Sequence, residues 1–151
     1  MATLIEFQRR LQILDSQVSL DFLLFKEIER FKNIFIRLNK EQLSKGEDNE
    51  GDIFGEYTQA TQEIAALGNP RKPKIAGQPY NFEDTGGLFD GFEMIIENST
   101  AQFWSTDSKT PELIVEYQGL FGLNPDNLQK VISTVILPAF LLSIRRELQL
   151  T

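Results

Sequence analysis

The residues with the clearest chemical potential in this chain are Asp84, Thr85 and Gly86, which follow one another in a segment rich in glycine and phenylalanine. A carboxylate in such a triplet can act as a general acid or base when it shares one proton with a second carboxylate. Because the chain holds one copy of the triplet, this chemistry requires two chains to meet as a dimer. The same residues can instead form a turn, in which Asp and Thr side chains bond nearby backbone amides and glycine permits a positive φ.

The triplet resembles the catalytic motif of retropepsin-like aspartic proteases, and this resemblance would make Asp84 the catalytic residue of a homodimer. In that family, hydrophobic strand residues precede the triplet and alanine usually follows it, whereas here Asn81, Phe82 and Glu83 precede it and Gly87 follows. The family's fold is almost wholly β, but this chain begins and ends in helical patterns. We therefore predict a structural turn that leads into a strand, and no catalytic residue. The predicted turn comprises Asp84, Thr85, Gly86, Gly87 and Leu88.

Composition removes several other classes of site. The chain has no histidine and no cysteine, which excludes imidazole and thiolate ligands as well as thiol nucleophiles, and we expect no cofactor and no metal. The acidic segment Gly46–Asp52 fails the calcium-loop pattern, because its sixth and twelfth positions, counted from Asp48, are Ile53 and Gln59. A net charge of −7 argues against specific nucleic-acid binding. The basic residues near Arg71 are predicted to lie in a solvated loop.

The most apolar stretch of the sequence is Val131–Ile144, which contains two serines, a threonine and Pro138. It falls short of the roughly 18–20 apolar residues that span a bilayer. No signal-peptide core is present near Met1. The sequence therefore predicts a soluble chain without a membrane partner.

Two apolar stripes predict helices over residues 1–45, with Asp15–Ser16 as a cap between them. The second helix, from about Val18 to Lys45, would be roughly 40 Å long at 1.5 Å per residue. Its apolar face packs either on the domain's own sheet or on a neighbouring chain, and the sequence leaves both open. The predicted candidate partner contacts are Phe31, Phe35, Leu38, Arg71, Lys72 and Lys74.

The rest of the chain predicts an α+β fold with a central antiparallel hairpin and a kinked C-terminal helix. A helix is expected over Thr58–Ala66, strands over Gly91–Glu97 and Ala101–Ser105, and helix starts at Thr110 and Asn124. One face of the last helix carries Leu128, Val131, Ile132, Val135, Ile136, Ala139 and Leu142, and Pro138 should kink it. We predict one domain over residues 1–151. Its parts are a helical arm (1–45), a loop-rich connection (46–79), the hairpin region (80–109) and a helical C-terminal part (110–151).

Two segments resemble the phage virion-morphogenesis family, which comprises tail-completion, neck and head–tail joining proteins. The segment Gly51–Thr58, with Thr61, is similar to that family's Asp-Gly turn with an aromatic residue and a Ser/Thr stretch. Asp84-Thr85-Gly86-Gly87-Leu88 is similar to its Asp-Thr-Gly-x-Leu before the central hairpin. The resemblance covers Gly46–Lys109 and extends to uncharacterised proteins of phages and prophages from Bacteroidetes-like hosts. The family's His-Gln-Phe-Gly-like segment is missing, and Leu113–Leu123 stands in its place.

The resemblance implies a non-enzymatic virion component that is assembled in the host cytoplasm as a homo-oligomeric ring. Its expected partners are other virion proteins: the portal or connector, the tail tube or the tail terminator. A small acidic inhibitor or regulatory binding module also suits a cysteine-free chain of this charge. Assembly state separates the two, because a ring component oligomerises whereas an inhibitor binds one small basic partner as a monomer.

Overall fold

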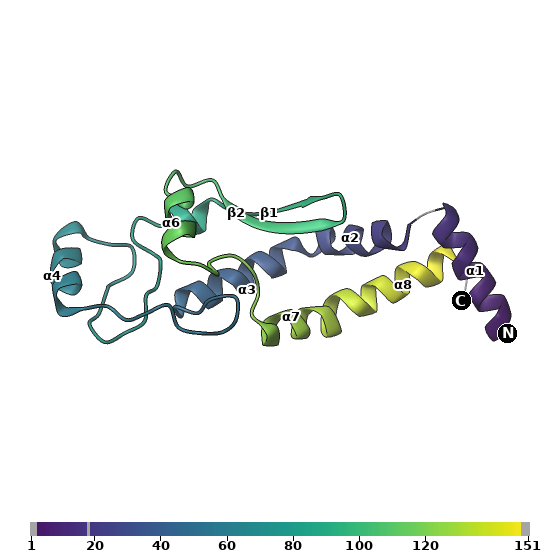
Figure 1. The fold of residues 1–151 in the computed structure, drawn as a ribbon, viewed down its shortest axis with the longest axis horizontal. Coiled ribbons are helices and arrows are strands. Elements are labelled where there is room, and N and C mark those ends of the chain that lie inside the picture. The colour runs from purple at the N-terminus through teal and green to yellow at the C-terminus, as the bar shows by residue number, and fades with distance from the viewer. Residues whose placement is uncertain (1–2, 18, 149–151) are drawn as a thin grey trace.

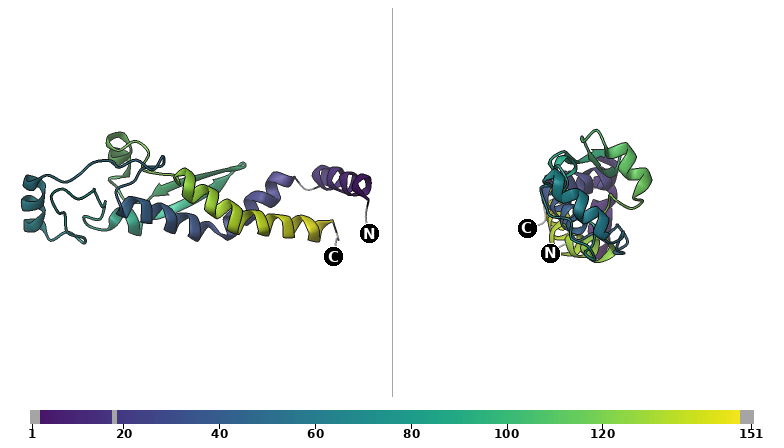
Figure 2. Two further views of the ribbon diagram at one scale, coloured as in Figure 1. Left: turned by 90° about the horizontal axis from the view of Figure 1, so that it is seen from below. Right: turned by 90° about the vertical axis from the view of Figure 1, so that its left-hand side faces the viewer.

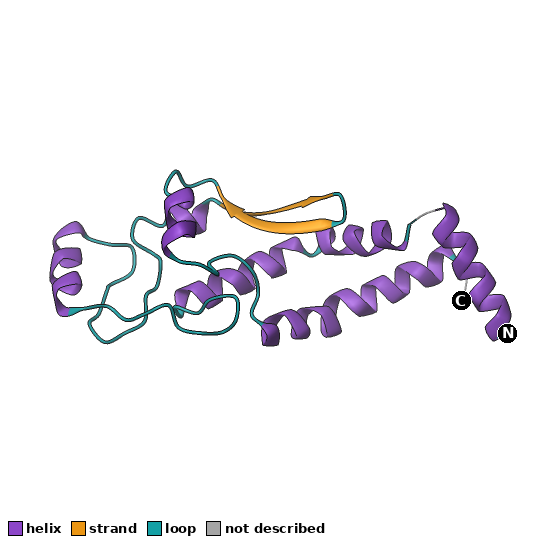
Figure 3. Cartoon of the chain, in the orientation of Figure 1, coloured by secondary structure: helices purple, strands orange, loops and turns teal. Residues whose placement is uncertain are grey.

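The computed structural model describes residues 3–17 and 19–148, and it combines helices with one antiparallel hairpin, which confirms the α+β class (Figures 1 and 3). The N-terminal helices are α1 (Leu4–Gln17), α2 (Leu20–Arg30) and α3 (Lys32–Ser44), and α4 (Gln59–Gly68) follows a loop. The one-turn helix α5 (Gly87–Asp90) precedes strands β1 (Phe92–Glu97) and β2 (Thr100–Ser105). The C-terminal part holds α6 (Thr110–Glu116), α7 (Pro125–Val131), the π-helical turn η1 (Ile132–Ile136) and α8 (Leu137–Glu147).

The molecule is elongated and layered (Figures 1 and 2). The α2–α3 segment lies between the hairpin and the α7–α8 helix, with α4 at one end and α1 at the other. The middle layer supplies three of the seven residues of the main core, which is formed by Ile28, Phe35, Leu38, Met94, Leu123, Val131 and Ile136. A second cluster lies under α5, and a third joins α1 to the end of α8.

The predicted helix from Val18 to Lys45 is two helices in the structure, and Val18 itself lies outside the described residues. Phe31 separates α2 from α3 with φ −105° and ψ 16°. Its carbonyl accepts a hydrogen bond from the Ile34 amide at 2.9 Å, so a tight three-residue turn replaces the regular helical spacing. The prediction of a cap at Asp15–Ser16 is also wrong, since α1 continues to Gln17 and Ser19 precedes α2.

The hairpin matches its prediction closely. Strand β1 pairs antiparallel with β2 in a register that runs from Phe92 opposite Ser105 to Glu97 opposite Thr100. Asn98 and Ser99 both have positive φ, as a two-residue hairpin turn requires. Phe92 and Met94 are buried whereas Ile95 is exposed, so one face of the hairpin packs on the core.

The predicted helix starts are confirmed at Asn124 and at the Thr58 helix, where each side chain accepts a hydrogen bond from the amide three residues on. Thr110 differs from its prediction as a cap. It is the first residue of α6, and its buried hydroxyl donates to the Ser105 carbonyl at 3.0 Å. The disturbance predicted at Pro138 takes the form of a wider π-helical turn, η1, immediately before α8.

A buried polar network fixes where the C-terminal helix begins. On α3, Asn39 accepts a hydrogen bond from the Gly122 amide at 2.8 Å, and Gln42 donates to the Gly122 carbonyl at 3.0 Å. The Gln42 side-chain oxygen accepts from the Asn124 amide at 2.9 Å and from the Asn127 side chain at 2.8 Å. Both α3 side chains are almost fully buried. These bonds tie the middle layer to the first turn of α7.

Candidate functional site

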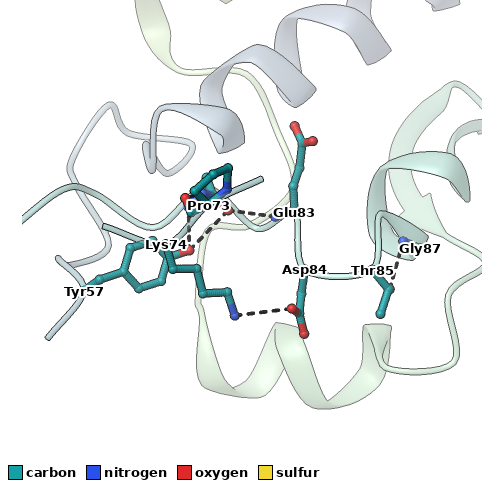
Figure 4. Close-up of polar contacts among 8 residues, drawn as sticks. Tyr57, Pro73, Lys74, Glu83, Asp84, Thr85 and Gly87 are labelled. Carbon is teal, nitrogen blue, oxygen red and sulfur yellow. Dashed lines mark hydrogen bonds and ion pairs between the residues drawn. The ribbon is translucent and has the colours of Figure 1, made fainter. Parts of the chain in front are cut away.

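The chain bends at Asp84–Gly86 and then enters α5, so the structure places these residues in a turn, one helical turn ahead of the strand. Gly86 has φ +86° at the start of α5, whereas Gly87 is already helical and has no positive φ. The Thr85 hydroxyl accepts a hydrogen bond from the Gly87 amide at 3.3 Å (Figure 4). Of the two glycines, Gly86 is the one that uses the positive φ that glycine permits, and the one-turn helix α5 separates the predicted turn from β1.

The Asp84 carboxylate points away from Glu83 and toward a lysine (Figure 4). Its Oδ1 atom lies 3.6 Å from the Lys74 Nζ atom, and its side chain is 60% exposed. Among the described residues, Lys74 is the one with which Asp84 forms an ion pair. An exposed carboxylate in an ion pair with an ammonium group suits a surface contact within the chain.

The basic loop is exposed at Arg71 and Lys72, as predicted, and its backbone is also docked on this turn. The Arg71 amide donates to the Asp84 carbonyl at 2.7 Å, and the Lys72 amide donates to the Glu83 carbonyl at 3.1 Å. The Arg71 guanidinium donates to the Asp90 carboxylate at 2.8 Å, and this hydrogen bond raises the pKa of Arg71. Two segments that are far apart in sequence thus brace one another.

The same loop lies close to its neighbours, which limits what its cations can offer a partner. A side chain at Gly86 would collide with the Arg71 guanidinium. The Lys72 Nζ atom donates to the Ser44 carbonyl at 3.4 Å, and Lys74 stacks over the Tyr57 ring at 5.9 Å. These three predicted partner contacts therefore make contacts within their own chain, although Arg71 and Lys72 remain exposed.

A cavity of about 310 Å³ lies beside the turn. Its lining combines aromatic rings with charged side chains, among them Tyr57, Tyr80, Tyr117, Lys74, Asp84 and Asp107. The rings pack edge to face, as Phe82 and Tyr117 do at 5.1 Å between centroids, so they support one another. The Tyr57 hydroxyl donates to the Asn81 side chain at 3.2 Å and accepts from the Asn81 amide at 3.0 Å. The cavity wall is therefore a packed structural cluster with charged groups at its edge.

Burial raises the pKa of Tyr117 to about 12, with a further contribution from the nearby carboxylate of Glu116. The unfolded chain loses this proton near pH 10, about the ordinary value for tyrosine. Because the folded state retains the proton, we expect the free energy of unfolding to fall as pH rises from about 10 to about 12. Denaturant unfolding at a series of pH values checks this. Tyr117→Phe should lose the part of the slope that Tyr117 contributes, and an unchanged slope in that variant would contradict the assignment.

Asp84→Asn is expected to change the free energy of unfolding by less than about 1 kcal/mol, because an exposed ion pair contributes little. Urea unfolding of both proteins measures the difference. Lys74→Gln is the matched control, and it should have an equally small effect because it removes the other half of the same ion pair. Peptidase activity in the wild type that Asp84→Asn abolishes would contradict the structural interpretation of the turn.

The predicted partner contacts on α3 lie inside the chain. Phe35 is 4% exposed and Leu38 is 8% exposed, and both belong to the main core. Phe31 is half-buried against the same core. The apolar face of α3 therefore packs on its own hairpin and C-terminal helix, which resolves the alternative that the sequence left open. The prediction that Phe35 and Leu38 contact a partner is therefore wrong for this conformation, in which both are buried.

The apolar side chains left uncovered lie instead on the C-terminal helix. Val131 and Ile136 are buried five residues apart across η1, and this wider spacing rotates other apolar residues outward. Leu128, Ile132 and Leu142, which were predicted on the packed face, are among those outside. The exposed set is Leu128, Ile132, Leu137, Leu141 and Leu142, each between 37% and 50% exposed. No charged residue interrupts Val131–Ile144.

This helix also bears on the membrane prediction. In the part of the chain that the structure describes, Pro125–Glu147 is the segment long and apolar enough to cross a membrane, judged by its 23 residues and their composition. The sequence analysis considered only the apolar stretch Val131–Ile144, whereas in the structure the helix extends beyond both ends of that stretch. One side of it packs on α2, where Ser143 donates to the buried Glu27 carboxylate at 2.7 Å. Length and composition alone therefore assign no membrane role.

Comparison with known proteins adds no relative from which a role could be transferred. No protein-family model, no curated protein and no solved structure matches the chain. The function is consequently argued from the geometry above.

Proposed function

We propose that this chain is a non-enzymatic structural component of a phage virion, a head–tail joining or tail-completion protein. It acts by contacts with copies of itself and with portal, connector or tail proteins. The observation that carries the proposal is the uncovered apolar surface of the C-terminal helix. The resemblance of Gly51–Thr58 and Asp84–Leu88 to virion-morphogenesis proteins supports the same role.

The exposed leucines and isoleucine of the C-terminal helix favour assembly because they form a stripe along a segment whose one charged residue between Leu128 and Leu142 is Lys130. Leu128, Ile132, Leu137 and Leu141 are spaced by four, five and four residues, and the five-residue step falls at η1. A contiguous apolar patch of this kind on a protein surface marks an interaction site. Burial of such a surface against other subunits would stabilise an oligomer.

The Asp84 turn has a structural role in this proposal. Through Arg71 and Asp90 it fixes the loop-rich end of the molecule to α5, and α5 leads directly into the hairpin. The turn thereby sets where the hairpin starts relative to α3. A virion joint needs such a rigid frame, because it works by surface complementarity.

The proposal is tested by purifying the full chain and measuring its mass by light scattering, alone and with the portal and tail proteins encoded beside it. The expected result is a homo-oligomer that binds at least one of those proteins. A monomer that binds none of them, and instead binds one small basic protein, would support the regulatory-module alternative and contradict the virion role.

A further inference from the structure

A second uncovered apolar surface lies on the other side of the middle layer. It is a groove of about 530 Å³ between α2 and the tip of the hairpin. Its apolar lining comes from Phe22, Phe25 and Ile96, and Phe22 is 60% exposed. Lys26, Glu29 and Glu97 line it as well, so the carboxylates outnumber the ammonium group. We call this surface the hairpin groove.

The C-terminal helix carries the complementary features. Leu137, Leu141 and Leu142 are each about half exposed, and we call this surface the helix face. Arg145 and Arg146 follow on the last turn of α8. Neither arginine forms an ion pair with any residue between 3 and 148 for which the structure gives contacts. Arg146 lines a pocket with Glu27 and Glu29 of its own α2, so the helix face presents leucines followed by the positive charge of Arg145.

The two surfaces lie on different layers, since the α2–α3 segment separates the hairpin from the C-terminal helix (Figure 1). On α2, Phe22 and Phe25 line the groove and Leu23 and Glu27 lie on the side toward α8. Lys26 and Glu29 lie at the edge between the two sides. The C-terminal helix of a chain therefore occupies the side of α2 next to its own groove, and leaves the groove itself uncovered.

We propose that the hairpin groove of one subunit receives the helix face of a second copy. This inference rests on the proposed function in assuming that copies of the chain assemble. Leu137 and Leu141 would cover Phe22 and Ile96, and Arg145, which follows them at the same four-residue interval, would meet the carboxylates of Glu29 and Glu97. Glu29 is already paired with Lys32 at 3.2 Å, but its side chain is half exposed and can accept a second cation.

The arrangement also favours a protein over a lipid as the occupant. One side of the C-terminal helix is held against α2, where Ser143 donates to the buried Glu27 carboxylate, so the helix does not present an apolar surface all round as a helix inside a bilayer does. Because the groove and the helix face are different surfaces, a single contact between two copies leaves one groove and one helix face unused. Such a contact is head-to-tail and can repeat, and it forms a ring if the rotation between subunits closes.

Two single variants test this contact. Phe22→Asp disables the groove and Leu141→Asp disables the helix face, since each would bury a charge among apolar groups. Each variant alone is expected to be monomeric, with its dissociation constant raised by at least roughly 100-fold. Mixed in equal amounts, the two should form a 1:1 dimer, because the intact helix face of Phe22→Asp fits the intact groove of Leu141→Asp. Native mass spectrometry of distinguishable, isotope-labelled chains measures this directly.

Both positions are exposed, so circular dichroism melting should show folded variants with wild-type Tm values. A wild type that assembles while the mixture stays monomeric, or while either variant still assembles alone, would overturn this contact and leave the virion role intact. The contact would also be overturned if the wild type floats with phosphatidylcholine vesicles and Leu141→Asp does not, because lipid would then occupy the helix face. A wild type that is monomeric and also absent from purified virions would instead remove the proposed function.

Discussion

Gln42→Leu is expected to lower the free energy of unfolding by about 3–5 kcal/mol, because each buried polar group left unpaired costs roughly 1–3 kcal/mol. The substitution removes the partner of the Gly122 carbonyl and of the Asn124 amide. It also removes an acceptor of the Asn127 side chain. Since a typical domain is stable by only about 5–15 kcal/mol, the loss would be a large fraction of the total. Urea unfolding followed by circular dichroism measures it.

The matched control is Gln59→Leu. Gln59 is exposed, and its side chain bonds only to the exposed Glu63 in the described structure, so little change is expected. Equal effects at the two positions would contradict the assignment of Gln42 as the link between α3 and the start of α7. Loss of α7 protection in hydrogen exchange, with the hairpin unaffected, is the local result expected for Gln42→Leu.

Gly46→Ala is the second substitution with a large expected effect. Gly46 has φ +76° where α3 ends, and an added Cβ would lie 2.7 Å from both the Pro79 Cβ atom and the Tyr80 carbonyl oxygen. The left-handed backbone alone costs about 1–2 kcal/mol for a residue with a side chain. Displacing the backbone that crosses the end of α3 adds to this, so we expect a total of roughly 2–4 kcal/mol.

Gly77→Ala separates the two contributions. Gly77 has a similar φ of +79°, but an added Cβ would meet no atom within 4 Å. The free energy of unfolding of Gly77→Ala should therefore fall only by the amount that the left-handed backbone costs. Thermal unfolding of both variants gives the comparison, and a Gly77→Ala loss as large as that of Gly46→Ala would show that packing against Tyr80 contributes nothing.

The sequence predicted correctly those elements that depend on residues close together in the chain. The alternation of Phe92, Met94 and Ile96 predicted β1 because a strand buries every second side chain. Asn124 before a proline predicted the start of α7, because a capping side chain and a fixed φ act within one turn. The break at Phe31 was not predictable in this way, since Phe31 continues the apolar stripe and no glycine or proline marks the interruption.

Long-range contacts account for most of what the sequence did not predict. Asn39 and Gln42 bond to residues some 80 positions later in the chain, and only their spacing from Phe35, which places all three on one helix face, gave a signal. Arg71 bonds to Asp90 in the same non-local way. The π-helical turn before Pro138 shifts the helix face that follows it, and Leu142, which was predicted to pack by a regular helical period, is exposed.

The proposed virion role is tested most directly by quantitative mass spectrometry of phage particles purified from cells that express this chain from its native locus. The prediction is that the chain is present in the particles at a fixed ratio to the portal protein, as a ring at the head–tail junction requires. Its absence from purified particles, with the chain recovered only in the soluble fraction of the lysate, would contradict the assignment.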